Sequence, residues 1–190
     1  NSGVNLIESK AQNLKAINDN SIDIVLCHWA LTLMDPIAPV LNEVRRVLTS
    51  EGRFAALVDG PVNLVPSYKE AHDLIYSYVQ KEIPSYGKID LGDPRIRGTK
   101  SLSNLAHKIF PKANVTIETN VVTIKGPVIQ VAEIAAGFFY AAFVLKPDKR
   151  KSMITSLSKI LAISKESTDA KKQGQFSMPI NRLLVEPYIK

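Results

Sequence analysis

Cys27, His28 and Trp29 are three consecutive residues whose side chains could carry out chemistry together. They stand at the end of the apolar run Ile22–Cys27, which only Asp23 interrupts and which predicts a strand buried on both faces of a parallel sheet. Ligands of open α/β sheets bind beyond the carboxyl ends of the strands, so a binding site is expected here. Because imidazoles exchange protons near neutral pH, His28 is our candidate general base.

Each of these residues also has a structural interpretation. His28 could donate a hydrogen bond to the backbone, and Trp29 could pack on the next helix, although we favour a place in a pocket wall. Cys27 ends a buried strand and has no basic neighbour beyond His28, so a nucleophilic thiolate is disfavoured.

Other kinds of site lack their sequence signatures. His28, His72 and His107 stand far apart, and a single cysteine offers no zinc-binding spacing, so we expect no metal. The sequence has neither a G-x-x-x-x-G-K-[ST] run nor a G-x-S-x-G elbow. Nucleoside triphosphatases and hydrolases with a serine elbow are therefore disfavoured.

The elements that must position these residues alternate between strand and helix. Asp35 is a candidate N-cap with Pro36 at the first helical position, and apolar residues then recur at helical spacing to residue 49. Phe54–Asp59 predicts a second strand, so strand, helix and strand form one right-handed crossover of an α/β fold. Further expected elements are strands at 4–7, 115–124 and 181–189, helices at 66–83, 101–110, 128–145 and 149–164, and a functional loop at 85–100.

The composition is typical of a single folded domain. The chain has 190 residues, of which 45% are hydrophobic and 22% charged. One cysteine excludes an internal disulfide framework, and no segment has the pattern of a secretory signal, so a cytoplasmic protein is expected.

Two segments raise the question of a nucleic-acid or membrane partner. Most of the net charge of +6 lies between Lys146 and Lys172, without aromatic residues to stack on bases, which favours a solvated face over nucleic-acid binding. Val128–Leu145 has one charge, Glu133, and that carboxylate and the short length argue against a membrane span. A buried helix, a helix over the substrate or a homodimer contact is expected instead.

Four segments are similar to a known family: AQNL (Ala11–Leu14), SIDIVLCHWALTLMD (Ser21–Asp35), EVRRVL (Glu43–Leu48) and EGRFAALVDG (Glu51–Gly60). They resemble the C-terminal part of class I S-adenosylmethionine-dependent methyltransferases of the ubiquinone/menaquinone biosynthesis type. The resemblance is good over residues 4–61 and loose over the rest. It implies a Rossmann-like sheet that lacks its first strand–helix units and has an added helical pair before the last strand. Residues 1–190 would then be one partial methyltransferase-like domain, with 128–164 as a helical insertion or cap.

The resemblance also implies roles for five residues. Ala11 and Gln12 would lie against the adenine of the cofactor. Cys27 and His28 would border the methionine moiety and the donor methyl group, and Trp29 would face the acceptor.

The sequence departs from the family in two ways. Lys10 stands where the family usually has a carboxylate that accepts from the adenine amino group, and a lysine has donors only. The family's glycine-rich turn and the acidic residue that binds the ribose would both precede Asn1. Because a βαβ unit takes about 30 residues, we expect that the chain is a fragment or that another chain or segment completes the sheet. Without such a completing segment, the strand at Ile22–Cys27 leaves an apolar edge of the sheet exposed.

The implied function is methyl transfer from S-adenosylmethionine to a small organic acceptor. Such transfers depend mostly on positioning, so His28 acts as a base only where the acceptor carries a proton. The alternative is a non-catalytic α/β interaction domain that has lost cofactor binding. A nucleic-acid-directed methyltransferase acting through residues 146–172 is the third possibility.

Overall fold

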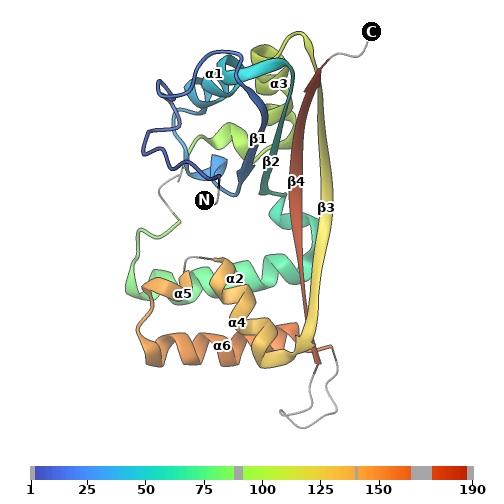
Figure 1. The fold of residues 1–190 in the computed structure, drawn as a ribbon. Helices are drawn as coiled ribbons and strands as arrows, with labels where there is room; N and C mark the ends of the chain where they lie inside the picture. The colour runs from blue at the N-terminus through green and yellow to red at the C-terminus, as the bar shows by residue number, and fades with distance from the viewer. Residues whose placement is uncertain (1–2, 88–91, 140, 164–172, 188–190) are drawn as a thin grey trace. The chain divides into compact units, whose positions relative to one another are not determined.

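The computed structural model describes residues 3–87, 92–139, 141–163 and 173–187. The chain has an α/β fold whose sheet has the strand order β1-β2-β4-β3 (Figure 1). Its residues cluster into two compact units. The first unit comprises residues 1–59, 91–119 and 181–190, and the second comprises residues 60–90 and 120–180.

The strands of the sheet are β1 (Ile22–His28), β2 (Leu48–Asp59), β3 (Ala113–Pro127) and β4 (Gln173–Pro187). β1 and β2 are parallel, as the expected crossover requires. Thr119 hydrogen-bonds to Asn181, and Thr123 to Ser177. Going from the first pair to the second, the residue number rises on β3 and falls on β4. These two neighbouring strands are therefore antiparallel.

In the first unit, two helices pack on one face of the sheet. They are α1 (Ile37–Val47) and α3 (Thr99–Ile109). The 3-10 turns η1 (Leu31–Leu33) and η3 (Pro94–Ile96) also contribute residues to the same core. The core side chains come from these elements and from the strands. The largest fully buried ones are Leu31, Ile37, Leu41, Phe54, Ile96, Leu102 and Leu183.

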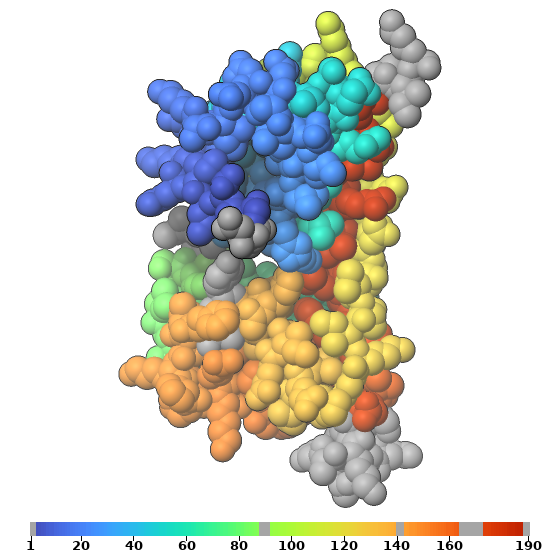
Figure 2. Space-filling view, viewed as in Figure 1, coloured from blue at the N-terminus to red at the C-terminus, as the bar shows by residue number. Residues whose placement is uncertain are grey.

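β1 is one of the two edge strands of the described sheet, and it confirms the strand expected at this place. Val25 and Cys27 pack against the core, whereas Ile24 is 61% and Leu26 76% exposed. The expectation that both faces are buried is therefore wrong, because only one face of β1 is covered by the described residues. Figure 2 shows the N-terminal part of the chain, in blue, at the surface of the first unit.

The strand expected at Val4–Ile7 does not form. Val4 is 71% and Leu6 98% exposed. A strand needs a neighbour for its backbone hydrogen bonds, and within the described residues the partner of β1 is β2 alone.

The start of α1 differs from the sequence expectation. Asp35 is not the N-cap, because Pro36 occupies that position with an extended backbone. The carboxylate at this helix end comes instead from Asp93, whose Oδ2 accepts from the backbone N–H of Ile37 at 3.4 Å. α3 begins at Thr99, two residues before the expected start at 101, with Gly98 as its N-cap, and the hydroxyl of Ser101 donates to carbonyl groups of the preceding turn.

β2 begins six residues earlier than expected. Ile22 pairs with Leu48, but Ile24 already pairs with Arg53, so residues 49–52 bulge out of the register. Gly52 allows this bulge, because a Cβ on it would lie 3.0 Å from the carbonyl oxygens of Ile22 and residue 49. β3 extends beyond the expected strand at 115–124 at both ends, and β4 begins eight residues before the strand expected at 181–189.

The second unit consists of helices and the adjoining halves of β3 and β4. The helices are α2 (Pro66–Glu82), α4 (Val128–Phe138), α5 (Ala141–Val144) and α6 (Pro147–Leu161), with the turn η2 (Val62–Leu64). α2 and α4 both pack on α6. In the described part of the chain, no helix has the length and apolar composition needed to cross a membrane.

The helix expected at 128–145 is interrupted after Phe138. Phe139 has an extended backbone, and its ring packs against Tyr68 and Phe176 with centroid distances of 5.6 and 6.5 Å. Because these aromatic contacts require Phe139 to leave the helix, packing outweighs the apolar pattern of the segment. Part of the expected loop, residues 88–91, and residues 164–172 lie outside the described residues.

Replacing Asp93 with asparagine is expected to reduce the loss of stability at acid pH. The Asp93 side chain is 5% exposed, and hydrogen bonds from Arg95 lower its pKa to about 2. The unfolded chain has an ordinary aspartate pKa of about 3.9. The ionised group therefore stabilises the fold fully above that value, and this stabilisation is lost as the pH falls through about 2.

Urea denaturation of the wild type and Asp93→Asn between pH 2 and pH 6 tests this linkage. The free energy of unfolding should fall less steeply with acid in the variant. Asp148→Asn, at an exposed position on α6, is the matched control and should follow the wild type. Equal slopes for Asp93→Asn and the wild type would contradict the expectation.

Candidate functional site

The carboxyl ends of β1 and β2 carry the candidate site. The parallel register pairs His28 with Leu57, so the two strands end next to each other. Trp29 follows β1 directly, and Asp59 is the last residue of β2. The indole Nε1 of Trp29 donates a hydrogen bond to Asp59 Oδ1 at 2.9 Å. The two strand ends are thus joined through side chains at the edge where α/β proteins bind ligands.

Trp29 has a backbone conformation that is rare for its residue type. Its φ angle of 52° lies in the left-handed region, which residues with a Cβ seldom occupy. The backbone N–H of Trp29 donates to the carbonyl of Leu57 at 3.0 Å, and the bond to Asp59 fixes the indole. Backbone strain that neighbouring contacts maintain in this way concentrates at functional sites.

His28 and Cys27 differ in exposure. The His28 side chain is exposed, and its ring meets the Trp29 ring edge-on at a centroid distance of 4.5 Å. Cys27 is half-buried against the core, and this burial raises the pKa of its thiol. The thiol therefore stays protonated and uncharged near neutral pH, which agrees with the expectation that a nucleophilic thiolate is disfavoured.

Ala11 and Gln12 lie in another segment of the first unit. They form the middle of a turn in which the Asn13 N–H donates to the Lys10 carbonyl at 2.8 Å. Both side chains are half-buried, and Ala11 packs against the core. The five predicted site residues thus come from two places: the turn at residues 10–13 and the end of β1.

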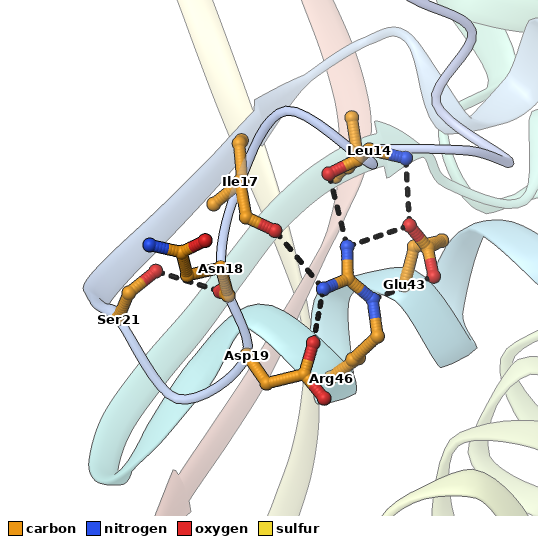
Figure 3. Close-up of polar contacts among 7 residues, drawn as sticks. All are labelled: Leu14, Ile17, Asn18, Asp19, Ser21, Glu43 and Arg46. Carbon is orange, nitrogen blue, oxygen red and sulfur yellow. Dashed lines mark hydrogen bonds and ion pairs between the residues drawn. The ribbon is translucent and has the colours of Figure 1, made fainter.

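A hydrogen-bond network attaches the segment after this turn to α1 (Figure 3). Glu43 Oε2 accepts from the backbone N–H of Leu14 at 2.6 Å. The Arg46 guanidinium donates to the carbonyls of Leu14 and Ile17 at 2.9 and 3.0 Å, and it also pairs with Asp19 and Glu43. One glutamate and one arginine therefore bind the backbone of the loop at residues 14–19, which we call the clamped loop.

The network shifts the acidity of both charged groups. Hydrogen bonds from Arg46 and from the Leu14 N–H lower the pKa of Glu43 to about 2. Hydrogen bonds to Glu43 and Asp19 raise the pKa of Arg46. Both groups stay charged throughout the physiological pH range.

Sequence reasoning missed three residues of this region. Asp59 ends the second predicted strand, and that place alone could have pointed to it, because strand ends gather at one edge. Glu43 and Arg46 stand three residues apart within EVRRVL, a spacing that puts two side chains on one helix face. No sequence signal named the backbone groups that they bind.

Comparisons with known proteins support the methyltransferase resemblance. Residues 1–56 match the family model of a methyltransferase domain, and no curated protein matches the sequence. The YcgJ protein from Bacillus subtilis has a similar structure with a TM-score of 0.51 and 14% identity, over 96% of this chain and 70% of that one. A putative methyltransferase from Bacillus halodurans gives a TM-score of 0.54 and 14% identity, over 96% of this chain and 77% of that one.

These findings support a methyltransferase. Residues 1–56 carry part of a methyltransferase domain, and the fold is that of class I methyltransferases. The expected recognition, fold class and enzyme class are thereby confirmed. The narrower ubiquinone/menaquinone type, the cap at 128–164 and the roles of the site residues stay predictions.

Proposed function

We propose that the protein transfers a methyl group from S-adenosylmethionine to a small organic acceptor at the carboxyl ends of β1 and β2. The observation that carries this proposal is the strained residue Trp29, hydrogen-bonded to Asp59 where the two parallel strands end. It follows the strand within the segment that matches the methyltransferase model. The cofactor, when bound, supplies the methyl group.

The residues at this site have the chemistry that the cofactor needs. The protonated thiol of Cys27 is a neutral neighbour for a methionine moiety. An adenine amino group needs an acceptor, which Lys10 does not provide but which backbone carbonyls of the turn around Ala11 and Gln12 offer. His28 borders the donor methyl group, and Trp29 faces the acceptor.

His28 then has a limited chemical role. Its exposed imidazole takes up the proton of an acceptor that loses one on methylation. For an acceptor without such a proton, the site works by holding donor and acceptor in line.

The exposed face and edge of β1 suggest that a further segment contributes to this site. Ile24 and Leu26 are largely exposed, and among the described residues β1 has a sheet partner on one edge only. We propose that a further strand–helix segment, from a longer form of the chain or from another chain, covers them and provides the glycine-rich cofactor loop. A cytoplasmic location and a homodimer are also part of the proposal.

A non-catalytic interaction domain is the second candidate function. The same exposed residues, Ile24 and Leu26, favour it, because an uncovered apolar strand face is a contact surface for a partner. Lys10, at the position of an adenine-binding carboxylate, points in the same direction.

Calorimetric titration with S-adenosylhomocysteine separates the two functions. We expect it to bind to this chain or to a form extended at the N-terminus by its own coding sequence. Adenosine triphosphate, which shares adenine and ribose but lacks the amino-acid part, is the control ligand and should bind far more weakly. If neither form binds S-adenosylhomocysteine, the methyltransferase proposal is rejected in favour of the interaction domain.

A further inference from the structure

We propose that Glu43 and Arg46 are positioning residues of the cofactor site, which hold the turn at residues 10–13 in the conformation that receives the adenosyl group. The inference rests on the proposed function for the identity of the ligand. It adds two residues of α1 that lie outside the strand-end site and to which the resemblance assigned no role.

The contacts to Leu14 place the clamp directly beside the turn. The backbone N–H of Leu14 donates to Glu43, and its backbone carbonyl accepts from Arg46. Both backbone polar groups of Leu14 are therefore held by side chains of α1 (Figure 3). Because Leu14 follows Asn13, the last residue of the turn, fixing Leu14 fixes the direction in which the turn leaves the core.

The far end of the clamped loop is held as well. Arg46 donates to the Ile17 carbonyl and pairs with Asp19. The backbone N–H of Asn20 then donates to the carbonyl of Arg46 itself at 3.0 Å. The chain is thus attached to α1 from residue 14 to residue 20, and the turn at 10–13 extends from a fixed base.

The residue types suit this task. A guanidinium offers five donors in a rigid plane, so one arginine can bind two carbonyls and two carboxylates at once. A lysine ammonium has three donors around a point and cannot reproduce that arrangement. Arg45, the neighbour on α1, points elsewhere and donates to the Ile109 carbonyl on α3 at 3.1 Å.

A fixed loop favours binding because the ligand does not have to order it. The apparent dissociation constant rises in inverse proportion to the fraction of molecules in the competent conformation. If losing the clamp leaves about one tenth of the loops correctly placed, the affinity for the adenosyl ligand falls about tenfold.

The test combines three variants with two readouts. Glu43→Gln and Arg46→Lys weaken the clamp with little change in shape, and Arg45→Lys is the matched control on the same helix. Hydrogen exchange of the free protein reports the amides of residues 13–21. Calorimetry with S-adenosylhomocysteine, in the form of the chain that binds it, reports affinity, and the melting temperature monitors the whole fold.

The proposal expects faster exchange at residues 13–21 and an about tenfold larger dissociation constant in both clamp variants, measured at a temperature where both variants remain folded. The double variant should lose no more affinity than one single variant, because the two residues act as a unit. Unchanged exchange, or faster exchange with unchanged affinity, would overturn it. A purely structural role would instead lower the melting temperature and leave the affinity of the folded protein intact.

Failure of the proposed function gives a different result. If the wild type binds no S-adenosylhomocysteine in either form, the methyltransferase proposal fails and the adenosyl role of the clamp fails with it. If the wild type binds and the clamp variants bind equally well, only the positioning role is wrong.

Discussion

Replacing His28 with asparagine is expected to lower turnover about a hundredfold for an acceptor that loses a proton, the lower end of what general acid–base catalysis contributes. The asparagine amide keeps hydrogen-bonding groups but cannot take up a proton. Since the His28 ring is exposed and contacts Trp29 only at its edge, the change leaves the strand end intact. Affinity for S-adenosylmethionine should stay within about twofold, because the base acts on the acceptor.

Turnover is measured as release of S-adenosylhomocysteine with a panel of small phenols, thiols, amines and thioethers. Thioethers lose no proton on methylation, so their turnover should be the same in His28→Asn and the wild type. His107→Asn on α3 is the control, since His107 bonds only within its own helix turn among the described residues. Unchanged turnover with phenols and thiols would remove His28 from the mechanism, and a parallel loss of cofactor affinity would make it a binding residue.

The elements that sequence alone located well are those whose pattern is local. β1 follows from an apolar run too short for a helix, and its boundary is off by one residue. α2 begins at Pro66, which suits the first turn of a helix, and its buried residues recur at helical spacing. In both cases, neighbouring residues in the chain determine the outcome.

The features that sequence could not provide depend on residues far apart in the chain. Trp29 bonds to Asp59, and the carboxylate at the start of α1 comes from Asp93, 56 residues beyond Ile37. Neither pairing leaves a periodic signal. The expectation of one continuous helix at 128–145 is wrong for the same reason. The contacts of Phe139 with Tyr68 and Phe176 override a favourable local pattern.

The candidate site shows the same division. The end of β1 could be predicted because strands of parallel sheets gather ligands at their carboxyl ends. The left-handed conformation of Trp29 and the bonds of Glu43 and Arg46 to backbone groups appear only when the chain is folded. Sequence therefore indicated which residues to expect at the candidate site, whereas the structure shows which contacts hold those residues in place.

Replacing Gly92 with alanine is expected to destabilise the first unit by about 3 kcal/mol, from left-handed backbone strain of 1–2 kcal/mol together with a steric clash. Gly92 has a φ of +75°, and a Cβ there would lie 2.3 Å from the carbonyl oxygen of Thr32. The atoms that the Cβ would meet belong to the backbone of Thr32 and Met34, so a side-chain rotation cannot relieve the clash. The segment would have to move away from η1, and the bond from the Asp93 N–H to the Met34 carbonyl at 2.9 Å would be lost.

Urea denaturation followed by tryptophan fluorescence measures this effect selectively. Trp29 is the single tryptophan of the chain and belongs to the first unit, so its emission reports the unit that contains Gly92. Gly137→Ala makes the same change in α4, where a Cβ would meet no atom within 4 Å, and it should leave the Trp29 transition unchanged. If Gly92→Ala unfolds at the same urea concentration as the wild type, the segment after residue 91 is not held against η1. The buried Asp93 carboxylate would then lose its role at the start of α1, because the close approach of Gly92 to Thr32 is what brings Asp93 to that helix end.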